Sequence, residues 1–194
     1  MTAGDIELRF AIHDLLARYC HGVDHGDLEM AVGVYWPEAI DHHGDHWDGN
    51  GQEYVRDLIG RFAVAFPPGS GKRACVHQVT NLLVERSGAD EARAQSSFTV
   101  YVPHERDGLP RLAMLVGRFL DRVERRGEEW RIIERVVLND FSRDDIPGGI
   151  YAPGSWQEGG YAAGAFGPGD PGVGFLAGAG VGLGDAAEQG TAAS

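Results

Sequence analysis

Two residues far apart in the chain have side chains suited to acid–base chemistry: Asp24 in RYCHGVDHGD and His77 in CVHQVTN. A carboxylate that accepts from one imidazole nitrogen fixes the tautomer and raises the basicity of the other nitrogen. If these side chains meet, they form a general base that works near neutral pH. Each has a structural alternative, because Asp24 could cap the next helix and His77 could be a hydrogen-bonded core residue.

A second group of ionisable residues is the segment DHHGDHWD at 41–48. Its members with metal-ligand side chains are Asp41, His42, His43, Asp45, His46 and Asp48. His42 and His46 share a face only on a helix, whereas Gly44 and Gly49 favour a loop. We therefore expect a solvated loop or a pocket rim here, and we predict neither a metal nor a cofactor for the protein.

Other motifs are weak. SGK at 70–72 precedes Arg73 and so lacks the Ser or Thr of a phosphate-binding loop. The glycines at 178–184 follow no strand of a βαβ unit, which argues against a dinucleotide fingerprint. Cys75 lies on the same strand face as His77, and we expect it to pack against a pocket.

The elements that must position these residues change in type along the chain. Apolar spacing predicts a helix over residues 5–21, ended by Gly22 and Gly26. After it we expect a helix over Leu28–Tyr35 with Asp27 as N-cap, a short strand over Ala39–His43 and a helix over Gly51–Phe66. Four long strands follow, over Lys72–Glu85, Ala92–Pro103, Arg111–Arg125 and Glu129–Asn139. Helices followed by antiparallel strands indicate an α+β fold, with a curved sheet packed on three helices around an apolar pocket.

Composition limits the function. The chain has 194 residues and a net charge of −12, which argues against nucleic acid and anionic membranes as partners. Two cysteines are too few for a disulfide scaffold, so we expect a cytoplasmic location. Residues 1–143 are predicted to form one domain, and 144–194 a glycine-rich tail. The tail could be flexible, but its aromatic residues suggest that Tyr151–Tyr161 covers the cavity or a neighbouring subunit.

Several segments in order resemble the SnoaL-like branch of the nuclear transport factor 2-like superfamily over residues 5–143. LLARYCHGVDHGDLE is similar to its R-Y-x4-D-x2-D pattern, and VYWPEAIDHHGDHWDGNGQEYV to its acidic W-P-x-A segment. CVHQVTN resembles its H-x-x-x-N strand, and GRFLDRVERRGEEWRIIERVVLND its G-R-[FY] and W-x-I ending. The resemblance implies a cone-shaped α+β barrel around a deep apolar cavity, and assembly into dimers or trimers.

The resemblance also implies an activity. Similar proteins include scytalone dehydratase, bile-acid 7α-dehydratase and hexachlorocyclohexane dehydrochlorinase, in which an Asp–His dyad removes a proton. Asp24 and His77 match the dyad, and Tyr19 matches a pocket tyrosine. Arg135 matches a polar pocket residue, although Arg131 has the same strand parity and is an alternative.

The expected function is therefore a cofactor-independent lyase or isomerase, dehydratase-like, acting on an apolar, cyclic small molecule. One alternative is a non-catalytic ligand-binding or assembly module of the same fold. Another is a subunit similar to the small subunit of ring-hydroxylating dioxygenases.

Overall fold

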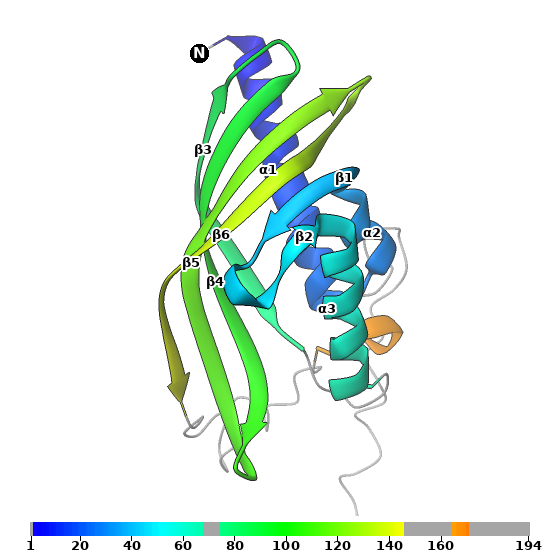
Figure 1. Cartoon of the computed structure of the whole chain (residues 1–194), viewed down its shortest axis with the longest axis vertical. Coiled ribbons are helices and arrows are strands. Elements are labelled where there is room, and N and C mark those ends of the chain that lie inside the picture. Colours follow the sequence, from blue (N-terminus) through cyan, green and yellow to red (C-terminus); the bar gives the residue numbers. More distant parts are fainter. Residues whose placement is uncertain (1, 68–73, 146–163, 171–194) are drawn as a thin grey trace, which may run out of the picture.

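The computed structural model describes residues 2–67, 74–145 and 164–170 (Figure 1). The helices are α1 (Ala3–His25), α2 (Leu28–Gly33) and α3 (Gly51–Ala65), with short 3-10 turns η1 (Gly44–His46) and η3 (Gly167–Gly169). The strands are β1 (Tyr35–His42), β2 (Asp48–Asn50), β3 (Val76–Arg86), β4 (Glu91–Arg106), β5 (Leu109–Arg126) and β6 (Glu129–Asp145). None of the described helices is long and apolar enough to cross a membrane.

The strands form a single sheet in the order β2-β1-β6-β5-β4-β3. All neighbours are antiparallel except β1 and β6, which run parallel. The long strands β3 to β6 twist strongly, and the three helices lie on one side of them (Figure 1). This arrangement confirms the predicted α+β class, with a curved and mostly antiparallel sheet against three N-terminal helices.

Helix α1 is longer than predicted because Gly22 does not end it. Its N-terminus carries a capping box between Thr2 and Asp5, and its C-cap is Gly26 at a φ of 73°. Gly22 lies inside the last turn, where an added Cβ would come within 2.7 Å of Ala31. Its role is close packing of α2 against α1, and the extended helix carries Asp24 in its last turn.

The first strand also begins earlier than predicted. The second helix ends at Gly33 rather than at Tyr35, and Asp27 caps it through the amide of Met30, as expected. Tyr35 instead pairs with Ile132 of β6, so tertiary pairing decides the structure of this segment. The short strand β2 was not predicted, and β4, β5 and β6 extend beyond the predicted ends.

One described segment follows the sheet. The strand β6 runs to Asp145, past the predicted domain boundary at residue 143. Residues 164–170 lie beside α3, drawn in orange in Figure 1. Phe166 is buried there, with its ring edge-on to Phe62 at 6.2 Å and its atoms close to Gly26. The proposed covering segment Tyr151–Tyr161 lies outside the described residues, as do Lys72 and Arg73.

Candidate active site

Asp24 lies on the buried face of the last turn of α1. Tyr19, Cys20 and Val23 share that face, because residues four positions apart lie one above the other on a helix. A carboxylate at this end opposes the helix dipole, which costs about 0.3–1 kcal/mol. Asp24 also does not cap the next helix, since Asp27 does. The helix therefore presents a buried carboxylate at an unfavourable position, which favours the functional interpretation of Asp24 over the capping one.

The structure brings Asp24 and His77 together. His77 Nδ1 lies 2.5 Å from Asp24 Oδ1, and the His77 backbone N–H donates to Oδ2 at 2.8 Å. Because an ionised carboxylate can only accept, the geometry assigns the ring proton to Nδ1. The unprotonated Nε2 is then the basic atom. The His77 side chain is 11% exposed, so the ring is buried but not sealed.

Cys75 does more than pack against the pocket. Its thiol donates to Asp24 Oδ1 at 3.2 Å, and Sγ lies 3.9 Å from His77 Nδ1. Asp24 thus accepts from the ring, from the backbone and from the thiol. Within the described ranges, these three residues also form the group whose donor atoms are close enough to hold a metal ion.

Tyr19 connects the dyad to the middle of the sheet. Its ring is edge-on to His77, with centroids 6.2 Å apart, and edge-on to Tyr35 at the same distance. Burial raises the pKa of Tyr19 well above its ordinary value. The hydroxyl therefore remains a neutral hydrogen-bond donor at neutral pH.

Arg135, and not Arg131, faces the interior. Arg135 and Ile132 are both fully buried, although their spacing of three would place them on opposite faces of a regular strand. The register between β5 and β6 shifts at this point, and such a bulge reverses the alternation. Arg131 therefore points outward, where it pairs with Glu129. In a regular strand Arg131 and Arg135 would lie on the same face, but the bulge between them places them on opposite faces.

A buried carboxylate holds the Arg135 guanidinium. Nε and Nη2 donate to the two oxygens of Asp121 at 2.7 and 2.9 Å, and Cζ lies 4.1 Å from the Phe119 ring and 4.4 Å from the Tyr19 ring. Burial lowers the pKa of Arg135, but the charge and hydrogen bonds of Asp121 together with Tyr35 and Tyr19 outweigh it, and the pKa lies well above its usual value. Nη1 is buried and has no partner among the described residues.

The segment 41–48 divides into an inner and an outer Asp–His pair. On the inner face, Asp41 is fully buried, accepts from Tyr35 Oη at 2.6 Å and contacts His43 Nδ1. On the outer face, His42 Nδ1 lies 2.6 Å from the exposed Asp48. The expectation of a solvated loop or a pocket rim therefore fits the outer pair, and the buried contact of the inner pair was not predicted.

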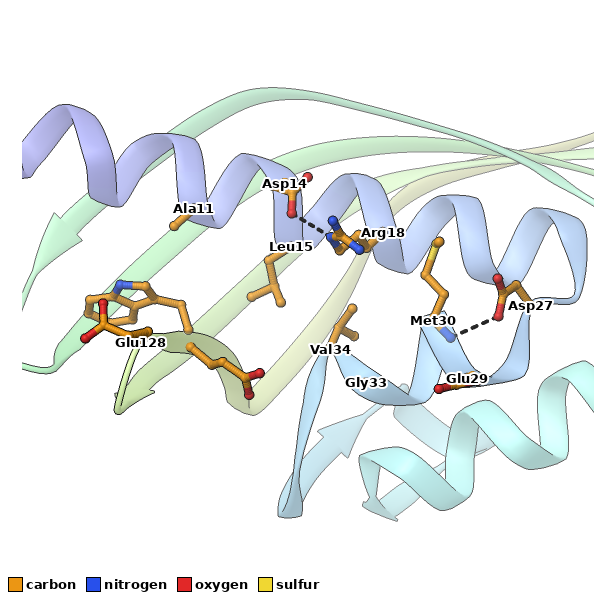
Figure 2. Close-up of a pocket in the computed structure, with 12 residues that line it drawn as sticks. Ala11, Asp14, Leu15, Arg18, Asp27, Glu29, Met30, Gly33, Val34 and Glu128 are labelled. Atoms are coloured by element: carbon orange, nitrogen blue, oxygen red, sulfur yellow. Dashed lines mark hydrogen bonds and ion pairs between the residues drawn. The ribbon is translucent and has the colours of Figure 1, made fainter. Parts of the chain in front are cut away.

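A cleft on the described part of the surface lies elsewhere. It has a volume of about 570 Å³ and lies between α1, α2 and the turn that joins β5 to β6 (Figure 2). Its carboxylates are Asp14, Asp27, Glu29, Glu128 and Glu129. Arg18 is its cation and is paired with Asp14 at 2.6 Å. An acidic cleft of this kind does not suit an apolar ligand, and it contains neither member of the dyad.

Comparison with known proteins identifies the family. Residues 4–136 match the SnoaL-like domain. The chain belongs to the SnoaL-like family. This assignment places it in the nuclear transport factor 2-like superfamily and confirms the resemblance seen in the sequence. A search of curated proteins found no match.

Solved structures with the same fold include a candidate scytalone dehydratase from Novosphingobium aromaticivorans, at 19% identity and a TM-score of 0.61, covering 75% of this chain and 92% of the other. A type 2 hexachlorocyclohexane dehydrochlorinase is 19% identical, with a TM-score of 0.64 and coverage of 77% and 95%. The type 3 enzyme from Novosphingobium barchaimii is 18% identical, with a TM-score of 0.63 and coverage of 77% and 97%. At these identities, the likeness shows a shared fold.

Proposed function

We propose that the protein is a cofactor-independent lyase or isomerase of the dehydratase type, in which His77 removes a proton from a carbon atom of an apolar small molecule. The observation that carries the proposal is the contact between His77 Nδ1 and the buried Asp24 carboxylate. It fixes the ring and leaves Nε2 as the base. The dehydratase and dehydrochlorinase among the structural neighbours are consistent with this chemistry.

Two donors near the dyad can stabilise the negative charge that proton removal creates. The Arg135 guanidinium has Nη1, which is unpaired within residues 2–67, 74–145 and 164–170, and the Tyr19 hydroxyl stays protonated. A hydrogen bond to a developing enolate oxygen or to a leaving oxygen lowers the barrier most in a buried site, where the donors are already oriented. The aromatic rings of Tyr19, Tyr35 and Phe119 surround the guanidinium and keep it in a largely apolar setting.

The test is replacement of the base. The panel of substrates consists of cyclic β-hydroxy ketones, which have an acidic C–H bond and a leaving hydroxyl. For His77→Ala we expect a loss of at least about 10²-fold in kcat/KM, because a positioned base supplies about 10²–10⁴-fold. For Asp24→Asn we expect a loss in kcat, since the carboxylate orients the ring rather than binding the substrate.

A binding module of the same fold gives a different result. Such a protein would bind apolar ligands tightly, and its behaviour would not change when His77 is replaced. A wild-type protein that binds panel members but does not convert any of them therefore favours that alternative. Membership of a homo-oligomer, a cytoplasmic location and the covering role of the tail remain predictions.

A further inference from the structure

A second imidazole, His43, is oriented in the same way as His77. Its Nδ1 contacts Asp41, whose side chain is completely buried, and Asp41 also accepts from Tyr35. The His43 ring stacks on Tyr54 of α3, with centroids 4.1 Å apart and an interplanar angle of 28°. The carboxylate and the stacked ring fix the imidazole, and no described residue forms a hydrogen bond with Nε2. The His43 side chain is 16% exposed, close to the 11% of His77.

Asp41 and His43 belong to the interior that contains the first dyad. Asp41 lies opposite Arg135 in the register of β1 and β6, and Arg135 lies opposite Asp121 in the register of β6 and β5. The row across the sheet therefore contains one guanidinium between two carboxylates. Asp121 accepts hydrogen bonds from two nitrogens of Arg135. Among the described residues, the hydrogen-bond partners of the Asp41 carboxylate are Tyr35 and His43.

Aromatic side chains connect the two Asp–His pairs. Tyr19 contacts the His77 ring on one side and the Tyr35 ring on the other, and Tyr35 donates to Asp41. Burial raises the pKa of Tyr54, and the nearby charges of Asp41 and Cys75 influence it as well. Tyr54 therefore lies near Asp41, which contacts His43, and near Cys75, whose thiol contacts Asp24.

We propose that His43, oriented by Asp41, is the general acid that protonates the leaving group while His77 acts as the base. The inference rests on the proposed function and adds a substrate requirement. The substrate must carry a hydroxyl on the carbon next to the one that loses its proton. Elimination leaves an oxygen that must gain a proton, and an imidazole tied to a buried carboxylate can supply it.

The proposed step is balanced as follows. Nε2 of His77 takes the proton from carbon, and the C–H electron pair becomes the second bond of the new C=C. His43 enters this step as the imidazolium, with one proton on Nδ1 toward Asp41 and one on Nε2. The C–O bond breaks with its electron pair on oxygen, and the oxygen takes the Nε2 proton and departs as water, which leaves His43 neutral. His77 then returns a proton to solvent and His43 takes one up, so that no cofactor is consumed.

The experiment separates proton removal from loss of water. The probe is 3-hydroxy-1-tetralone, which gives 1-naphthol after loss of water and tautomerisation. One readout is formation of 1-naphthol, and the other is exchange of the C2 protons in deuterated water above the buffer rate. The variants are His43→Phe, which keeps an aromatic ring against Tyr54, and His77→Ala. His42→Phe is the matched control, since the same change is made one residue away on the outer face. His43→Gln keeps a donor for Asp41 and is used if His43→Phe does not fold by circular dichroism.

We expect His43→Phe to lower 1-naphthol formation by about 10²-fold or more and to leave C2 exchange within about 3-fold of wild type. His77→Ala loses both reactions, and His42→Phe loses neither. If His43→Phe forms 1-naphthol as fast as His42→Phe, or loses exchange together with elimination, the role of His43 is refuted and the proposed function stands. If the wild-type protein catalyses neither reaction, or if His77→Ala keeps both, the proposed function itself is overturned.

Discussion

The buried ion pair between Asp121 and Arg135 gives the sharpest stability prediction. The two side chains are 1% and 0% exposed, and they share hydrogen bonds of 2.7 and 2.9 Å. In Asp121→Asn the carboxylate charge disappears, and the amide N–H₂ that replaces one oxygen faces a donor of the guanidinium. The guanidinium then remains buried without its counter-charge, since Asp41 is already engaged by Tyr35 and His43.

Removal of one partner of a buried ion pair costs about 3–5 kcal/mol. We therefore expect Asp121→Asn to lower the free energy of unfolding by about this amount, measured by urea denaturation with tryptophan fluorescence. Asp140→Asn is the control, since it removes the charge of the exposed pair between Arg118 and Asp140 on the same two strands. We expect little or no change there, because exposed pairs contribute little.

A double variant separates the charge from the packing. In Asp121→Leu with Arg135→Met, both charges are replaced by apolar side chains, and we expect most of the lost stability to return. A double variant as unstable as Asp121→Asn would show that packing rather than the unpaired charge is the cause. An Asp121→Asn protein as stable as wild type would refute the burial of Arg135 itself. We expect the double variant to be inactive even if it is stable.

Three further predictions follow from packing and burial. Gly22→Ala should lower the free energy of unfolding by about 1–3 kcal/mol, because its Cβ would meet Ala31. Gly60→Ala on α3, where a Cβ would have nothing within 4 Å, should raise it by about 0.5–1 kcal/mol. Thermal unfolding measures both changes. Burial raises the pKa of Tyr19 well above its usual value, so the stability from its neutral form is present below pH ~10 and lost as the pH rises further. In an alkaline titration, the tyrosinate absorbance that belongs to Tyr19, obtained by difference from Tyr19→Phe, should appear together with unfolding. Burial raises the pKa of Cys20 to about 12, so iodoacetamide at pH 8 should leave it unmodified in the native protein and modify it in urea, as peptide mass spectrometry would show.

Local patterns in the sequence were sufficient to predict most of the elements and to single out two candidate residues, but the pairing of these residues was implied by the family resemblance alone. Asp24 and His77 could be singled out because one follows a strongly periodic helix and the other lies in an alternating strand. The exact end of α1 could not be predicted, because Gly22 looks like a helix terminator until its contact with Ala31 is known. Propensity could not show that Tyr35 joins β6 rather than the preceding helix.

The remaining site residues depend on strand register. Asp121 was missed because its pairing with Arg135 follows from the alignment of β5 and β6, which includes a bulge. Asp41 and His43 were predicted to lie in a short strand that leads into a solvated loop or a pocket rim, and their contact was not predicted. The structure places Asp41 within β1 and His43 directly after it. A usable signal was present: Asp41 and Arg135 are opposite charges in two strands predicted to border the same pocket.

The central claim is that His77 is a base whose free nitrogen is Nε2. The most direct measurement is a long-range ¹H–¹⁵N NMR spectrum of uniformly labelled protein at neutral pH, with His77→Gln used to assign the ring. We predict a protonated Nδ1 and an unprotonated Nε2 for His77, and loss of this preference in Asp24→Asn. A proton on Nε2 with a bare Nδ1 would contradict the account, because the ring could not then donate to Asp24 and accept a proton from a substrate at Nε2.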